Sequence, residues 1–117
     1  KNYEIKPGDI VLLRTGYSKY WGMAKYVEDS PYLSEEMAQA LVDLKIKAIG
    51  IDFISPDKVE DNAAPVHKIF MKNSVHIIEN LNRLDEIDKP RVFFAAAPLL
   101  IYKADGGFTR AFAVIED

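Results

Sequence analysis

Apolar and polar positions along the chain follow two periods, one typical of strands and one typical of a helix. Four apolar runs have the length of strands: residues 10–13, 75–81, 92–97 and 110–115. Ser34 is a typical helix N-cap, and two glutamates follow it in the first turn. Apolar residues then recur at helical spacing, at Met37, Ala40, Leu41, Leu44 and Ala48. Residues 45–52 pass from this helix into a further strand, so the pattern predicts an α/β domain with a mixed sheet and one long helix packed on it.

Length and composition narrow the class of protein. The 117 residues fit a single domain over residues 1–117, and 49% hydrophobic with 28% charged residues is ordinary for a globular chain. A net charge of −3 without a basic stripe argues against a nucleic-acid partner. No apolar run approaches the roughly 18 to 20 residues of a spanning helix, and the first residues do not resemble a signal peptide. We therefore expect a cytoplasmic protein with no membrane role.

Candidate chemistry gathers in residues 64–81, which hold both histidines of the chain, His67 and His76. On the predicted strand, Glu79 shares a face with three aliphatic residues, and a carboxylate there needs a hydrogen-bond donor, a cation or a metal. Pro65 suits the first position of a short helix, which would place His67 within reach of Glu79. The absence of cysteine leaves any metal to His, Asp and Glu, and an imidazole with a carboxylate suits Zn²⁺ or Mn²⁺.

The alternatives to a metal pair stay open on spacing alone. An isolated His and Glu at this spacing are more often an ordinary hydrogen-bonded pair, or two unrelated side chains, than a metal pair. Two ligands do not make a catalytic site, which usually has three protein ligands and an open position for water. His76 faces away from Glu79 on the strand interpretation and is expected to be structural.

Two further groups of residues have a functional and a structural interpretation. Tyr17, Tyr20 and Trp21 lie in a predicted loop, where they would line a pocket for an aromatic ligand or simply cover the core. Asp52 and Asp57 follow a predicted strand, where acidic residues serve functional loops or cap turns through their own backbone. The two interpretations are balanced for Asp52, and turn-capping is favoured for Asp57.

Several blocks of the chain, taken together and in order, resemble a known family. The blocks are residues 8–16, 49–57, 65–67, 77–81, 97–99, 104–107 and 110–111. They are similar to the carboxy-terminal half of the cyclase family of metal-dependent hydrolases, which includes bacterial kynurenine formamidases and isatin hydrolases. The resemblance implies a swivelling β/β/α fold, a small-molecule amide substrate, and hydrolysis of its C–N bond by water activated at a zinc or manganese centre. It also implies that His67 and Glu79 are metal ligands, and it assigns no catalytic residue in this chain.

The chain departs from the family pattern in one respect. The family's amino-terminal motif, His-x-Gly-Thr-His-x-Asp-x-Pro-x-His, cannot be assembled from the two histidines present. One hypothesis is that this chain is the carboxy-terminal piece of a longer enzyme, cut or split so that the missing segment is on another chain or lost; the expected partner is a second copy in a homo-oligomer or a chain that supplies the missing segment. The other is a degenerate relative without hydrolase activity that serves as a binding or oligomerisation module. Both hypotheses predict an incomplete metal site and little or no activity from this chain alone.

Overall fold

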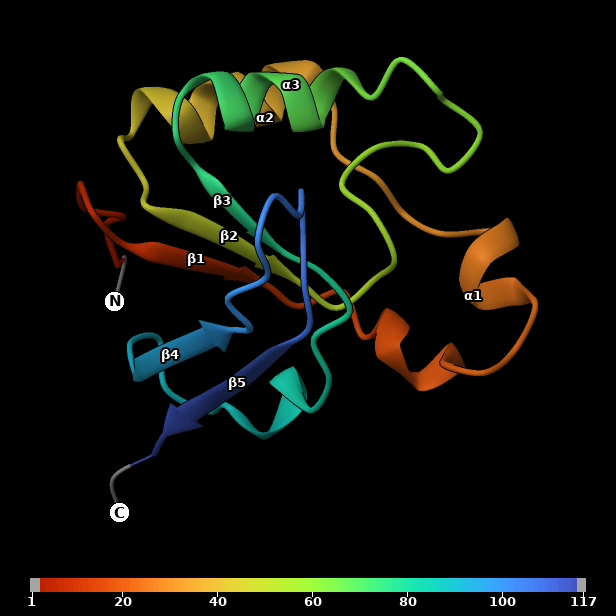
Figure 1. Ribbon diagram of the computed structural model, residues 1–117. Coiled ribbons are helices and arrows are strands. Elements are labelled where there is room, and N and C mark those ends of the chain that lie inside the picture. Colours follow the sequence, from red (N-terminus) through yellow and green to blue (C-terminus); the bar gives the residue numbers. More distant parts are fainter. Residues whose placement is uncertain (1–2, 116–117) are drawn as a thin grey trace. The chain divides into compact units, whose positions relative to one another are not determined.

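The computed structural model describes residues 3–115, and Figure 1 shows its ribbon. The chain divides into two compact units, Lys1–Asp85 and Glu86–Asp117. The organisation of residues 1–117 as a single domain stays a prediction.

The first unit is built on a three-stranded parallel sheet. Its strands are β1 (Ile10–Leu13), β2 (Ala48–Ile51) and β3 (His76–Ile78), in the order β1-β2-β3. Every residue of the central strand β2 is buried, which is typical of a parallel strand covered on both faces. Gly50 allows close packing here, because a Cβ atom at this position would lie 2.6 Å from Leu12 Cδ2.

Two helices, α2 (Glu35–Asp43) and α3 (Pro65–Lys72), lie together over one face of this sheet (Figure 1). The Ser34 hydroxyl accepts a hydrogen bond from the Met37 amide, which confirms the predicted N-cap of α2. The core between helices and sheet is formed by Leu33, Ala38, Leu41, Ile46, Ile49, Ile51, Phe53, Val66, Phe70 and Val75. Three shorter helical segments are η1 (Tyr17–Tyr20), α1 (Lys25–Glu28) and η2 (Leu84–Glu86). None of the helices within residues 3–115 is long and apolar enough to cross a membrane.

The helical part of the fold differs from the sequence-based expectation in two ways. Within residues 3–115 the single long helix is replaced by two shorter ones, α2 with nine residues and α3 with eight. The α2 helix stops because Lys45 adopts a left-handed conformation, with φ of 57°. The predicted apolar stripe is also shifted, since Met37 and Leu44 are 47% and 43% exposed while Ala38 is fully buried. The small side chain of Ala38 permits the close packing of α2 on its neighbours, a preference that hydrophobicity alone does not reveal.

The second unit contains an antiparallel hairpin of β4 (Phe93–Pro98) and β5 (Thr109–Val114). Phe93 lies opposite Val114, and Pro98 lies opposite Thr109 at the far end of the ladder. The α/β class is therefore confirmed, but the single mixed sheet is wrong. The strands sort into a parallel sheet and a separate antiparallel hairpin.

Candidate metal half-site

The first turn of α3 is capped by a residue that lies outside the helix. Its N-cap residue, Ala64, has no side-chain acceptor and adopts a left-handed conformation with φ of 45°. Asp57, in the loop that follows β2, takes over this role with its carboxylate. Asp57 Oδ1 accepts from the Val66 amide at 2.7 Å, and Oδ2 accepts from the His67 amide at 2.9 Å. A negative charge is favourable at this position because helix N-termini present unpaired N–H groups.

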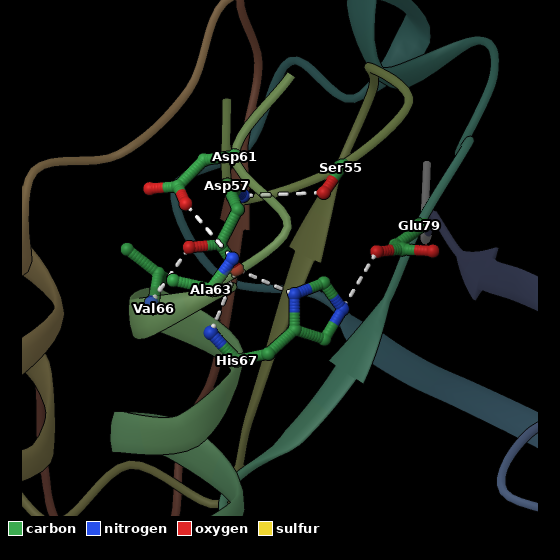
Figure 2. A network of polar contacts seen from close by, with 7 residues as sticks. All are labelled: Ser55, Asp57, Asp61, Ala63, Val66, His67 and Glu79. Carbon is green, nitrogen blue, oxygen red and sulfur yellow. Dashed lines mark hydrogen bonds and ion pairs between the residues drawn. The ribbon is translucent and has the colours of Figure 1, made fainter. Parts of the chain in front are cut away.

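The same carboxylate contacts the imidazole ring of His67, as Figure 2 shows. His67 Nδ1 lies 2.6 Å from Asp57 Oδ2, and His67 Nε2 lies 3.2 Å from Glu79 Oε1. Asp57 is 4% exposed, whereas the side chains of His67 and Glu79 are about one third exposed. One imidazole ring thus bridges a buried carboxylate and a more accessible one.

Glu79 reaches His67 from the segment that follows β3. The strand ends there because Asn80 adopts a left-handed conformation, with φ of 59°, which breaks the alternation predicted through residue 81. Burial raises the pKa of the Glu79 carboxyl above its ordinary value; the neighbouring His67 partly offsets this shift, and Asp57 adds to it. The expected contact between His67 and Glu79 therefore forms, while His76 is exposed on β3. Their roles as metal ligands stay a prediction.

The pair has the chemistry of two ligand positions but not of a whole site. Within residues 3–115, no group of three or more His, Cys, Asp or Glu side chains is placed to hold a metal ion. A nitrogen and an oxygen bound to one tetrahedral zinc ion, each about 2.1 Å from the metal, lie about 3.4 Å apart. The observed separation of 3.2 Å between His67 Nε2 and Glu79 Oε1 is close to this value. The donors present fit a divalent metal that takes further ligands from elsewhere.

Neither Asp52 nor Asp57 caps its own turn, because the hydrogen-bond donors to both carboxylates lie elsewhere in the chain. Asp52 is 1% exposed and accepts hydrogen bonds from the Thr15 amide, the Thr15 hydroxyl and the Gly16 amide. These bonds tie the end of β2 to the loop after β1. The contact between Asp57 and His67 was not predicted from the sequence. The available signal was the helix start at Ala64-Pro65, which lacks an N-cap side chain and so requires an acceptor from elsewhere.

The three aromatic residues of the predicted loop lie in or next to η1, and they form a cluster with Tyr26. Tyr17 packs edge-on against Tyr20 and stacks on Tyr26, and Trp21 meets Tyr26 edge-on with ring centroids 5.2 Å apart. The Tyr17 hydroxyl donates to the Lys25 carbonyl at 2.8 Å. Tyr17 and Tyr20 are thereby engaged in local packing, whereas the Trp21 side chain is 66% exposed.

A small cavity of about 110 Å³ lies beside this aromatic cluster. It is lined by Ser18, Trp21, Tyr26, Asn80, Leu81 and Asn82. The Tyr26 hydroxyl donates to the Asn80 side chain at 2.9 Å, and Asn80 follows Glu79 directly in the chain. Of the three predicted substrate contacts, Trp21 lines this cavity, and Tyr26 is an additional aromatic residue there.

The chain is also similar in sequence to known proteins. Residues 1–58 match the Putative cyclase family. An uncharacterized protein of Methanocaldococcus jannaschii is 33% identical over 108 residues, covering 92% of this chain and 54% of that protein. A kynurenine formamidase of Bacillus cereus is 30% identical over 111 residues, covering 95% of this chain and 52% of that enzyme. The resemblance to the cyclase family is confirmed.

Solved structures similar to this chain show the same fold. A predicted metal-dependent hydrolase from Bacillus stearothermophilus is 30% identical with a TM-score of 0.77, covering 94% of this chain and 51% of that one. Isatin hydrolase A from Ralstonia solanacearum is 26% identical with a TM-score of 0.82, covering 97% of this chain and 48% of that one. The chain thus spans about half the length of the relatives that it matches.

Proposed function

We propose that this chain supplies part of the active site of a metal-dependent amide hydrolase, with His67 and Glu79 as two of the ligands of a divalent metal. The observation that carries the proposal is the pair of facing donor atoms, His67 Nε2 and Glu79 Oε1, at 3.2 Å. The names of similar proteins support it, since they include a kynurenine formamidase and a predicted metal-dependent hydrolase.

The proposed metal is Zn²⁺ or Mn²⁺, because both accept imidazole nitrogen and carboxylate oxygen. When bound, such a metal lowers the pKa of water and polarises the carbonyl of an amide. In this chain, His67 and Glu79 would hold the metal. The proposed substrate is a small formamide or lactam.

The substrate contacts of this proposal lie in the aromatic cluster. Trp21 is the strongest of the three predicted contacts, because it lines the cavity next to the segment that carries Glu79. Tyr17 and Tyr20 would act mainly by supporting the surrounding segment, since Tyr17 bonds the Lys25 carbonyl and packs on Tyr20. The remaining metal ligands would come from residues outside this 117-residue sequence.

Equilibrium dialysis against Zn²⁺ and Mn²⁺ tests the proposal directly. We expect the chain to bind one of these ions, and the variants His67→Ala and Glu79→Ala each to lose binding at least tenfold. His76→Ala is the matched control, because this exposed histidine lies outside the pair and its removal should leave binding unchanged.

Two outcomes would overturn the proposal. Protein that is metal-free and indifferent to chelator would favour a binding or oligomerisation module, and the oligomeric state of the chain would then be the next measurement. Binding that His67→Ala retains and His76→Ala abolishes would assign the ion to an unrelated surface histidine. Turnover of an amide substrate is expected only when a partner supplies the missing ligands.

A further inference from the structure

We infer that Asp57 is a positioning residue that fixes the His67 ring with the proton on Nδ1, so that the lone pair of Nε2 faces Glu79. This inference rests on the proposed metal site, and it adds a residue that neither the family blocks nor the two-ligand proposal assigns a role.

The Asp57 carboxylate is itself held in place. Its Oδ1 accepts the Val66 amide at 2.7 Å, and its Oδ2 accepts the His67 amide at 2.9 Å. At 4% exposure the side chain has little room to take another position. Two bonds from the rigid first turn of α3 therefore set the direction in which the carboxylate faces the ring.

An ionised carboxylate can only accept hydrogen bonds. His67 Nδ1, 2.6 Å from Asp57 Oδ2, must therefore be the donor in that contact. A neutral imidazole carries one N–H and one lone pair, so the lone pair is left on Nε2. The hydrogen bond that one ring nitrogen makes thus decides what the other nitrogen offers, as is common for metal-binding histidines.

On the other side of the ring, the Nε2 lone pair would face a second acceptor, Glu79 Oε1, at 3.2 Å. Two acceptors at this distance are favourable only when a proton or a cation lies between them. The arrangement of Asp57, His67 and Glu79 is therefore suited to a cation at that point.

The same carboxylate has a purely structural task, because it caps α3, and an experiment must separate the two tasks. Asp57→Ala removes both. Asp57→Asn keeps one oxygen for the first turn of α3 but replaces a charged partner of the ring with a neutral one. Ser34→Ala removes the N-cap of α2 without touching His67, and it serves as a matched control for the loss of a helix cap.

The first measurement is the position of the ring proton in the metal-free protein. Two-bond ¹H–¹⁵N correlation spectra distinguish the two tautomers, and the chain has only His67 and His76 to assign. Spectra are recorded at the alkaline end of the ring titration. We expect His67 to carry its proton on Nδ1 in the wild-type chain and in Ser34→Ala. In Asp57→Ala it should carry the proton on Nε2, because Glu79 is then the acceptor beside the ring.

The second measurement is the affinity for Zn²⁺ and Mn²⁺ by titration calorimetry. Loss of a partner behind a metal-binding histidine typically weakens binding about 10- to 100-fold. We expect a loss in this range for Asp57→Ala, about tenfold for Asp57→Asn, and no change for Ser34→Ala. If Asp57→Ala does not fold, Asp57→Asn and the wild-type tautomer carry the test.

The outcomes separate this inference from the proposed function. An Nε2 proton in the wild-type chain, an unchanged tautomer in Asp57→Ala, or wild-type metal affinity in folded Asp57 variants would overturn the role of Asp57 while leaving the ligands untouched. Failure of the wild-type chain to bind either metal would overturn the proposed function, and the tautomer would still decide whether Asp57 orients the ring.

Discussion

Removal of the Asp52 carboxylate should destabilise the first unit strongly, although this residue is not part of the candidate metal site. Asp52 is 1% exposed and accepts hydrogen bonds at 3.0 Å from the Thr15 amide, 2.6 Å from the Thr15 hydroxyl and 2.7 Å from the Gly16 amide. The variant Asp52→Ala leaves these three donors without their acceptor. The connection between the end of β2 and the loop after β1 is then lost.

The magnitude follows from the number and kind of these bonds. A hydrogen bond to a charged group contributes about 1.5–3 kcal/mol to stability. Three such bonds are offset in part by the cost of burying the carboxylate and by water that reaches the partly buried donors. We expect a net loss of about 3 kcal/mol in the free energy of unfolding. For a domain of this size, this corresponds to a fall in Tm of about 12–24 °C.

Urea denaturation measures this loss with two probes. Far-ultraviolet circular dichroism reports the sheet and helices, and the fluorescence of Trp21, the single tryptophan, reports the segment next to the Thr15 and Gly16 contacts. Thr15→Val is the matched control; it loses only the hydroxyl contacts, to Asp52 and the Tyr17 amide, and should cost about 1–2 kcal/mol. A loss below about 1 kcal/mol for Asp52→Ala on both probes would refute the reasoning and return Asp52 to the list of functional candidates.

Three further predictions test the packing, the cap and the charge of the first unit. Gly50→Ala places a Cβ 2.6 Å from Leu12 Cδ2 and 2.7 Å from Leu81 Cδ1, and should cost about 1–3 kcal/mol by urea denaturation; an unchanged midpoint would contradict the close packing. Ser34→Ala removes the cap of α2 and should cost about 1 kcal/mol, with Ser34→Thr nearly neutral; equal losses in both would argue against capping. Burial raises the pKa of Glu79 in the folded state, so the native chain binds more protons than the unfolded chain above the ordinary glutamate pKa. The protonated Glu79 carboxyl therefore stabilises the folded chain below the ordinary glutamate pKa, and this stabilisation is lost as the pH rises through the raised pKa of the folded state. Glu79→Gln should flatten this part of the plot of unfolding free energy against pH. An identical slope in both proteins would contradict the prediction.

The aromatic cluster shows how distant contacts arrange residues that lie close together in the sequence, and the role of Tyr17, Tyr20 and Trp21 as substrate contacts stays a prediction. The sequence placed Tyr17, Tyr20 and Trp21 near one another, and the structure packs them around Tyr26. Tyr26, which the loop pattern did not mark, is buried and bonds Asn80 from 54 positions away. Which ring faces a cavity and which ring supports another is decided by such distant contacts.

The sequence alone determined the features that depend on neighbouring residues. Ser34 caps α2, and Pro65 begins α3, because capping and the fixed φ of proline act within one turn. A short helix followed by a strand also placed His67 within reach of Glu79, since the two elements are adjacent in the chain, and the structure confirms the contact.

Only the tertiary structure decided the features that depend on distant partners. The sorting of strands into a parallel sheet and a separate hairpin follows from pairings between segments far apart, which alternation within a strand does not specify. The bonds of Asp52 cross 36 and 37 positions, and those of Asp57 reach 9 and 10 positions along the chain, across a loop whose path no local period encodes. A short acidic side chain can cap its own turn or reach another element, and the folded path of the backbone decides which of the two occurs.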